Sequence, residues 1–357
     1  MSAAPSPSPG SSGGRPNSGG RVEPPPRVGV RMLGTGLHLP ERVLSNEDLA
    51  RVMDTSDDWI VQRTGIRQRR AADLKNGETV TKLATEALRA AVADARIPAT
   101  ELDMVILATV SAEMTCPSSA CRVAHNVGAG KAAAFDLTAA CSGWVYALNL
   151  AHDLIRGGAH RTIAVIGAET LTKFMDYTTA GRTTAILFGD GAGAAILRAT
   201  DDTSKGVIAQ SMHADGAGWR ELFIPNTDDD YPAGFDRSTL PPGRMYMNGR
   251  EVFKFAVSTF QTLIAETLDK AGLKASDIDQ FVCHQSNIRI LESARERFGI
   301  PHEKLHTNID RLGNTSAASV PMLFDELRKA GTIREGQKVM FVAFGAGLTW
   351  GSSLWQF

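Results

Sequence analysis

The chain alternates between short apolar runs and amphipathic stretches. Short runs of consecutive apolar residues are typical of buried strands, whereas apolar residues three and four positions apart are typical of helices. In the first half, this pattern predicts strands at Val28–Leu37, Met104–Val110, Ala132–Thr138, Thr162–Ala168 and Ala194–Leu197. It predicts helices at Asn46–Met53, Ser56–Thr64, Thr79–Ala95 and Ser118–Val127, and one that begins at Ser142.

The pattern starts again near Gly206. Here it predicts helices at Gly249–Lys270, Asn287–Phe298 and Ser316–Ala330, with strands at Phe281–Cys283, Val339–Phe344 and Thr349–Phe357. Strands that alternate with helices of this length favour a mixed, mainly parallel sheet with helices on both faces. The sequence therefore predicts an α/β protein.

The two halves contain an internal repeat. Ala95–Asp103 aligns with Ala271–Asp279, and seven of the nine positions are identical or similar. A predicted helix precedes each copy and a predicted strand follows it, which favours two superimposable halves over a solenoid of short units. We expect residues 28–205 and 206–357 to pack face to face in a layered αβαβα sandwich, with catalytic residues from both halves.

Composition limits the possible functions. The 357 residues are 43% apolar and carry a net charge of -1, as expected for a globular protein and not for a general nucleic-acid binder. No apolar run approaches the roughly 20 residues that span a bilayer. The four cysteines form no C-x-x-C pair, so neither a disulfide framework nor a metal site is favoured, and a cytoplasmic location is expected.

The first 27 residues differ from the rest of the chain. They are mostly Pro, Ser, Gly and Ala and contain no apolar segment of the kind found in a secretory signal. This composition is typical of a disordered tail. A plastid-type transit peptide is the alternative, because the segment is rich in serine and nearly free of acidic residues.

A cysteine lies where one predicted strand runs directly into a helix. Small residues flank Cys141 on both sides, so the backbone can turn sharply and another group can come close. This is the arrangement of a nucleophile elbow. The amides of the helix N-terminus are expected to stabilise the thiolate and to lower the thiol pKa. The alternative is a cysteine that only packs in the core.

Two residues of the second half could work with this cysteine. His284 ends a predicted buried strand, and Asn314 lies in a polar loop before a helix, where it could also be a simple helix cap. A Cys-His-Asn set is found in cysteine hydrolases, where histidine deprotonates the thiol. In condensing enzymes, the histidine and asparagine both donate hydrogen bonds to a thioester carbonyl.

Several longer motifs decide between these uses. Asp54–Ile66, Asp136–Leu148, His284–Ile290, Gly313–Pro321 and Phe344–Ser352 together resemble β-ketoacyl-acyl carrier protein synthase III, the initiating condensing enzyme of bacterial fatty acid synthesis. The resemblance runs from about Met32 to Phe357. It implies the thiolase fold, with duplicated halves in a five-layered sandwich, and a homodimer.

The resemblance also implies a role for each catalytic candidate. Cys141 would accept the acyl group of a primer acyl-CoA, and malonyl-acyl carrier protein would then lose carbon dioxide and attack the thioester. His284 and Asn314 would hold the developing negative charge. The backbone N–H groups of Cys141 and Ala346 would form the oxyanion hole, although the family often has glycine where Ala346 stands. Coenzyme A enters as part of a substrate, and no cofactor is expected.

Binding residues follow from the residue spacing and from the resemblance. Trp59 and Arg63 lie four apart and so share a helix face, where they could sandwich an adenine ring. The resemblance adds Arg182 and Asn287 as coenzyme A contacts. It also places Lys254 and Arg289 where the family meets the acidic carrier protein. The loop Asp176–Arg182 is two residues longer than usual.

The primer pocket is expected to involve Cys116 and Phe188. Some family members carry a bulky aromatic residue at the position of Cys116, across the dimer interface, so we expect this enzyme to accept primers longer or more branched than acetyl.

Two glycine- or arginine-rich segments look like phosphate-binding sites but have simpler explanations. Gly189–Gly193 is expected to serve strand packing instead of phosphate binding, and Arg67–Arg70 to be a solvated basic run.

Other functions are weighed against this one. A papain-like hydrolase would have no use for the Trp59 and Arg63 pair, and a binding subunit without catalysis would not need Cys141, His284 and Asn314 together. A hydroxymethylglutaryl-CoA synthase or an ester-forming relative would share the fold. The loop that contains Asn314 and the run that starts at His284 favour the decarboxylative enzyme.

Overall fold

Residues 28–357 are described by a computed structural model of the chain. The predictions made for the first 27 residues lie outside this part. Within residues 28–357, no helix is long and apolar enough to cross a membrane.

The first half forms a five-stranded sheet with the strand order β1-β7-β6-β4-β5. Its strands are β1 (Gly29–His38), β4 (Met104–Ala108), β5 (Ala133–Leu137), β6 (Thr162–Thr170) and β7 (Asp190–Thr200). All five strands were predicted from the apolar runs. Among residues 28–357, the strand β5 lies at one edge of this sheet and pairs with β4 alone.

The second half forms a four-stranded sheet with the strand order β11-β12-β13-β8. Its strands are β8 (Gly206–Ala214), β11 (Gln280–Cys283), β12 (Lys338–Gly345) and β13 (Thr349–Gln356). The five-stranded sheet is thus built from residues before 201, and the four-stranded sheet from residues after 205.

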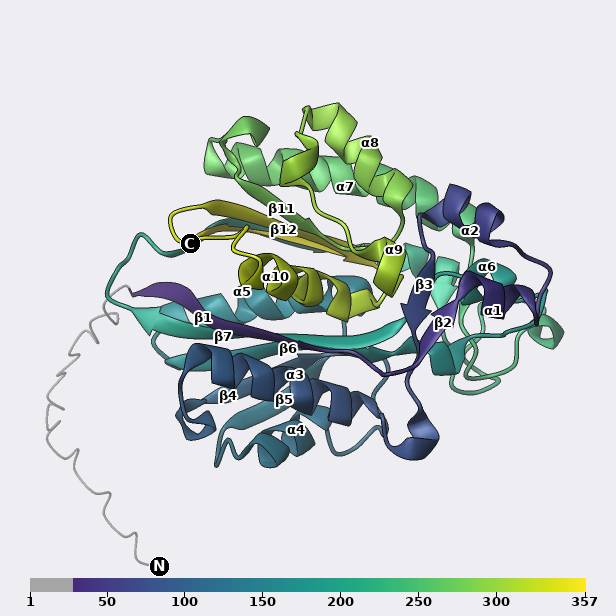
Figure 1. The fold of residues 1–357 in the computed structure, drawn as a ribbon, viewed down its shortest axis with the longest axis horizontal. Coiled ribbons are helices and arrows are strands. Elements are labelled where there is room, and N and C mark those ends of the chain that lie inside the picture. Colours follow the sequence, from purple (N-terminus) through teal and green to yellow (C-terminus); the bar gives the residue numbers. More distant parts are fainter. Residues whose placement is uncertain (1–27) are drawn as a thin grey trace, which may run out of the picture.

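Helices and sheets alternate in five layers (Figure 1). Outside the first sheet lie α3 (Val80–Ala95) and α4 (Ser119–Val127), and outside the second lie α7 (Gly249–Ala271) and α8 (Ile288–Phe298). Between the sheets lie α5 (Gly143–Arg156) and α10 (Ser319–Lys329). The predicted αβαβα sandwich is therefore confirmed.

Shorter elements surround one end of this sandwich. They are β2 (Val43–Ser45), α1 (Asn46–Ala50), α2 (Asp57–Thr64), β3 (Gln68–Arg70), α6 (Arg182–Ala185), β9 (Leu222–Phe223), β10 (Tyr246–Met247) and α9 (Ile309–Leu312). The helix predicted at Asn46–Met53 is thus shorter than expected, because only its first five residues are helical.

The prediction of a mainly parallel sheet was wrong. In the first sheet β4 pairs in parallel with β5 and β6, but β7 runs antiparallel to both β1 and β6. In the second sheet only β11 and β12 are parallel. A parallel pair needs a long crossover connection, whereas the short turn between β12 and β13 can only produce a hairpin.

The internal repeat corresponds to one structural unit that occurs twice. After α3 and after α7, the chain forms a short 3-10 turn, Ala99–Glu101 and Ala275–Asp277, and then enters a buried strand. Asp103 accepts a hydrogen bond from the backbone N–H of Thr162, and Asp279 accepts the equivalent bond from Lys338. Each aspartate thus ties the start of its strand to the neighbouring strand.

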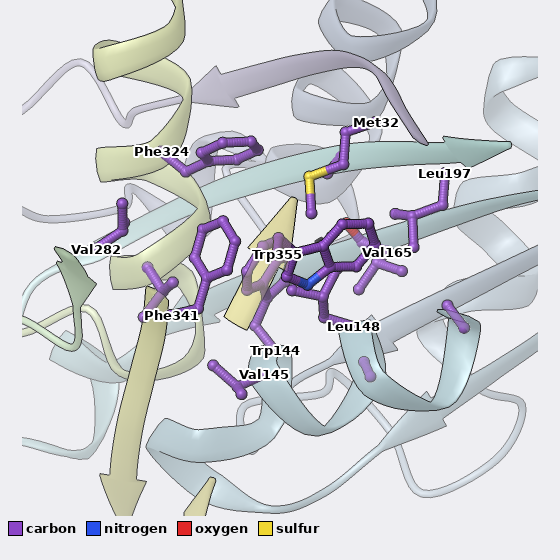
Figure 2. Packing of buried hydrophobic residues seen from close by; sticks show 14 of the residues in the cluster. Met32, Trp144, Val145, Leu148, Val165, Leu197, Val282, Phe324, Phe341 and Trp355 are labelled. Atoms are coloured by element: carbon purple, nitrogen blue, oxygen red, sulfur yellow. Dashed lines mark hydrogen bonds between the residues drawn. The ribbon is translucent and has the colours of Figure 1, made fainter. Parts of the chain in front are cut away.

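The layer between the two sheets holds a large hydrophobic core (Figure 2). Trp144 of α5 lies at its centre, with Phe324 of α10 and Phe341 of β12 within 6.4 Å between ring centroids. Its indole N–H donates to the Val165 carbonyl oxygen of β6 at 3.3 Å. Because residues from both sheets meet here, burial of this apolar surface holds the two halves together.

The two halves also touch at Gly167 of β6. A Cβ atom at Gly167 would lie 2.2 Å from the Ala317 carbonyl oxygen, a backbone atom of the second half. We expect Gly167→Ala to lower the free energy of unfolding by about 2 kcal/mol, the usual cost of overpacking. Urea denaturation checks this value. Gly216→Ala, where no atom lies within 4 Å, is the control and should leave stability unchanged.

Candidate active site

Cys141 lies at the predicted corner between strand and helix. After β5 the chain forms a 3-10 turn at Ala140–Ser142 and continues directly into α5. Ala140 has a φ of 45°, a left-handed conformation that a small side chain tolerates best. Gly345 of β12 lies so near that a Cβ atom there would be 2.5 Å from the Cys141 nitrogen. The sharp turn and the close approach are both confirmed.

Three candidate residues meet at one cavity. Cys141, His284 and Asn314 all line a cavity of about 90 Å³, together with Phe344 and Gly345 at the end of β12. Cys141 comes from the first half of the chain, whereas the other two come from the second. Each of the three side chains is at least nine-tenths buried. The halves thus supply complementary parts of a single site.

His284 follows β11 and is held from two sides. Its Nδ1 atom lies 2.7 Å from the Ser319 hydroxyl oxygen, and its ring packs edge-on against Phe344 at 5.5 Å between centroids. Burial lowers the pKa of His284 to about 3, so the imidazole is neutral at physiological pH. A Ser319 hydroxyl that donates to Nδ1 leaves the ring proton on Nε2, where it can serve as a donor.

Asn314 is fixed by its backbone and by its side-chain oxygen. Its N–H donates to the Leu187 carbonyl at 2.8 Å, and its carbonyl accepts from Gly189 at 3.0 Å. The side-chain Oδ1 accepts from the Ser316 N–H at 2.9 Å. Because the amide oxygen is engaged with the backbone, the Nδ2 group is the part of the side chain that remains for donation into the cavity.

A buried carboxyl group lies behind the cysteine and was not predicted. Glu169 of β6 accepts hydrogen bonds from the hydroxyls of Ser111, Thr109 and Ser316 at 2.5, 3.2 and 3.1 Å. Burial raises the pKa of Glu169 to about 7. The available signal was an acidic residue directly after the apolar run that ends at Ala168.

The expectation of a lowered cysteine pKa was wrong. Burial raises the pKa of the Cys141 thiol to about 12, and the charge of Glu169 adds to the increase. Hydrogen bonds from Ser316 and from the Cys141 backbone N–H lower it, but by less than burial raises it. The closed cavity removes the water that would solvate a thiolate, and this cost exceeds the stabilisation from the helix N-terminus.

The predicted coenzyme A contacts gather at α2. The guanidinium groups of Arg63 and Arg182 lie 4.2 and 5.2 Å from the centre of the Trp59 indole ring. Arg182 also donates to the Asp54 backbone oxygen at 2.6 Å, which anchors the end of the loop Asp176–Arg182 beside α2. One aromatic and two cationic groups therefore form a single surface, suited to an adenine ring and phosphates.

Asn287 connects this surface to the cavity. It lines the cavity, its Nδ2 group donates to the Arg63 carbonyl at 2.9 Å, and its Oδ1 caps α8 by accepting from the Arg289 N–H at 2.9 Å. Arg289 and Lys254 are both exposed. The Arg289 guanidinium lies over the ring of Phe253, the neighbour of Lys254 and a lining residue of the cavity. The two cations therefore flank the same rim.

A second cavity opens on the other side of Cys141. It measures about 260 Å³, and Ala346 and Phe188 line it together with Cys141. The remaining walls are largely apolar and include Val110, Leu171, Phe174, Leu222, Phe223, Ile224 and Met245. Cys116 is exposed and is not among its lining residues. Its predicted contribution concerns the partner's pocket in a dimer and stays a prediction.

The two arginine- and glycine-rich segments take part in packing and hydrogen bonding within the fold. Arg69 of β3 is fully buried and donates to the backbone oxygens of Leu44 and Ile186, so Arg67–Arg70 is not the solvated run that was expected. Gly189–Gly193 serves strand packing as expected, because a Cβ atom at Gly193 would lie 2.6 Å from the Met322 nitrogen.

Two duplicated halves with a cysteine at the elbow define a condensing enzyme of the thiolase fold. Residues 135–216 match the family model for 3-oxoacyl-acyl carrier protein synthase III, and residues 268–357 match the model for its C-terminal part. The chain therefore belongs to the β-ketoacyl-acyl carrier protein synthase III family, whose members are acyltransferases.

Individual relatives agree with this assignment. A β-ketoacyl-acyl carrier protein synthase III from Caldanaerobacter subterraneus subsp. tengcongensis is 43% identical, over 92% of this chain and 98% of the relative. The crystal structure of the Aquifex aeolicus 3-oxoacyl-acyl carrier protein synthase III superimposes with a TM-score of 0.85, at 40% identity, and covers 92% of this chain and all of the other. The priming β-ketosynthase of the R1128 polyketide pathway is similar at 34% identity and a TM-score of 0.84, covering 92% of this chain and 97% of the other.

Proposed function

We propose that this enzyme condenses a primer acyl-CoA with malonyl-acyl carrier protein. The products are a 3-oxoacyl-acyl carrier protein, coenzyme A and carbon dioxide, and the reaction initiates fatty acid biosynthesis. The observation that carries the proposal is the cavity where Cys141 meets His284 and Asn314. Family membership supports it, since the relatives are named for this activity.

In the first half-reaction, Cys141 attacks the thioester carbonyl of the primer. The carbonyl oxygen becomes an oxyanion, which the backbone N–H groups of Cys141 and Ala346 would hold, since both residues line the second cavity. Coenzyme A leaves as a thiol, and the acyl group stays on the cysteine. The second cavity receives the acyl chain, because it adjoins Cys141 and its walls are largely apolar.

In the second half-reaction, malonyl-acyl carrier protein enters the cavity lined by His284 and Asn314. Loss of carbon dioxide leaves an enolate, whose oxygen accepts hydrogen bonds from His284 Nε2 and Asn314 Nδ2. Its carbon then attacks the carbonyl carbon of the Cys141 thioester. The new carbon–carbon bond forms, the bond to the Cys141 sulfur breaks, and the sulfur is released and regains a proton. Neutral imidazole suits this task, because it donates a hydrogen bond without giving up a proton. None of these steps requires a resident cofactor or metal.

Substrate binding follows the surface between α2 and α8. Trp59, Arg63 and Arg182 would hold the adenine and phosphates of coenzyme A. Asn287 would contact the pantetheine arm at the cavity entrance, in exchange for its bond to Arg63. Lys254 and Arg289 would attract the acidic carrier protein to the same rim.

The primer range follows from the size of the second cavity. A volume of about 260 Å³ exceeds what an acetyl group fills, so butyryl- and isobutyryl-CoA are expected to be turned over at least as well as acetyl-CoA. Steady-state rates with the three thioesters and malonyl-acyl carrier protein check this. An enzyme confined to acetyl-CoA would show that the cavity does not hold the acyl chain.

A dimer built on β5 is part of the proposal. This short apolar strand lies at an edge of the first sheet, and an unpaired edge of this kind is a template for pairing with another copy. Light scattering is expected to give twice the mass of the chain. The variant Ala133→Asp, which places a charge at an exposed position of this edge, is expected to shift the mass toward the monomer.

A related role in a specialised pathway is the second candidate. It is favoured by the similarity to the priming β-ketosynthase of the R1128 polyketide pathway.

We also propose a cytoplasmic location, because Cys116, Cys121, Cys141 and Cys283 are all free thiols.

Intact-mass spectrometry tests the proposed function directly. Incubation with acyl-CoA should add one acyl group to the protein, and malonyl-acyl carrier protein should then remove it as 3-oxoacyl-acyl carrier protein. Release of free fatty acid from the acylated enzyme, without a condensation product, would instead indicate a hydrolase.

A further inference from the structure

Glu169 is a fully buried acid with no part in the steps above. Its Oε2 atom accepts from the Ser111 and Thr109 hydroxyls, and its Oε1 atom accepts from the Ser316 hydroxyl at 3.1 Å. The Val110 N–H donates to the same carboxyl group at 3.2 Å. Four donors aimed at one group favour its ionised form, despite the cost of burial.

Ser316 joins this carboxylate to the nucleophile. It lines the second cavity together with Cys141, and it is the side chain that favours the thiolate by lowering the pKa of Cys141. While Cys141 is a thiol, the Ser316 hydroxyl donates to Glu169 and its oxygen is free to accept a proton from the sulfur side. Once Glu169 is protonated, the same hydroxyl can donate to the thiolate, which is the interaction that lowers the pKa of Cys141. Ser316 has a φ of 50°, and its backbone N–H donates to Asn314, so the position of the side chain is fixed. Cys141, Ser316 and Glu169 therefore form a continuous chain.

On the basis of the proposed function, we propose that Ser316 and Glu169 carry the thiol proton during primer loading. As the Cys141 sulfur bonds to the thioester carbon, its proton passes to Ser316 Oγ, and the hydroxyl proton of Ser316 passes to Glu169. When the bond to coenzyme A breaks, the two transfers reverse and protonate the departing sulfur. Glu169 is then ionised again, and coenzyme A leaves as the thiol.

The charges around the site support this route. A proton that moves from Cys141 to Glu169 leaves one negative charge in the buried site before and after the transfer, so no second charge is buried. The pKa of Glu169, about 7, lies above that of His284, about 3, which makes Glu169 the stronger base.

Few other charged groups face Glu169. The Lys173 ammonium is the positive one, and it donates to the Ser111 carbonyl at 2.7 Å. Lys173 also faces Asp190 and Glu113, so its charge is shared among three acids. The Cys141 thiol is a second titratable group that faces Glu169.

Single-turnover loading over a range of pH tests the route. Glu169→Gln and Ser316→Ala are both expected to slow acylation of Cys141 about 100-fold, the usual contribution of a general base. Both should also remove the ionisation near pH 7 from the wild-type rate profile. Ser316→Ala keeps the backbone N–H that holds Asn314, so it removes the hydroxyl without displacing the Asn314 side chain.

Asp190→Asn is the matched control. Asp190 is another fully buried acid, its pKa is raised to about 6, and it accepts from Thr172 and from the Ala72 N–H outside both cavities. This variant should keep both the loading rate and the pH profile. Loss of the ionisation in Asp190→Asn as well would overturn the assignment to Glu169.

The proton route would be overturned if both Glu169→Gln and Ser316→Ala had the wild-type acylation rate and the wild-type pH profile. If Glu169→Gln does not fold, Ser316→Ala decides alone. Alkylation of Cys141 by iodoacetamide separates this proposal from the proposed function, because it reports thiol deprotonation without any acyl-CoA. If no acyl-CoA loads the wild type, the proposed function fails. The route is still supported if either variant removes the pH 7 ionisation from alkylation, and overturned if neither does.

Discussion

Replacing Cys141 by serine is expected to abolish acyl-enzyme formation. The hydroxyl is a far weaker nucleophile than the thiol and gives up its proton less readily. Loading and overall condensation should both fall by about 1,000-fold or more. Intact-mass spectrometry after incubation with acyl-CoA measures the first, and product formation from malonyl-acyl carrier protein measures the second.

The control is a second buried thiol outside both cavities. Cys283 of β11 is fully buried, as Cys141 nearly is, and burial raises its pKa as well. Cys283→Ser should still gain one acyl group. An acyl adduct that persists in Cys141→Ser and disappears in Cys283→Ser would show that the wrong cysteine has been assigned.

The helices and strands were predictable because their signals are local. Both the strand before Cys141 and the helix after it are set by the spacing of apolar residues over one or two turns. The repeat around Asp103 and Asp279 was equally visible, since each copy has a short 3-10 turn before its strand. The meeting of Cys141 with His284 and Asn314 required the resemblance, because spacing alone does not place two halves against each other.

Strand direction and burial were not predictable in the same way. The pairing of β7 with β1 and β6 depends on connections that run across the fold, and the apolar runs carry no direction. The burial of Arg69 was not predictable either. This residue looks like part of a surface charge run, but it is surrounded by residues that are distant in sequence. Long-range packing decides both features.

The pKa of Cys141 also depends on long-range packing that local sequence patterns do not predict. Position at a helix N-terminus is a local feature, and it predicts a lowered value. Enclosure by β12 and the charge of Glu169 are long-range features, and they reverse the direction. A sulfur that is protonated at rest must lose its proton during attack, so the group that receives the proton becomes part of the mechanism.

Removal of either hydrogen-bond donor is expected to separate the two half-reactions. His284→Ala and Asn314→Ala should still accept the primer, because Cys141 and the oxyanion N–H groups are unchanged. Condensation should fall about 100- to 1,000-fold in each, the usual cost of one lost donor to a developing oxyanion. Carbon dioxide release from malonyl-acyl carrier protein and intact mass after acyl-CoA measure the two half-reactions separately.

Two control variants distinguish a loss of stability from a loss of either half-reaction. His152 and Asn149 of α5 are buried residues of the same types, and each bonds to the backbone of β8 or β13 outside both cavities. Their alanine variants should lose stability but keep both half-reactions. If His284→Ala and Asn314→Ala instead lost loading and kept decarboxylation, the two side chains would serve the cysteine and not the enolate. The proton route through Ser316 and Glu169 would then have no separate task, since His284 would already take the thiol proton.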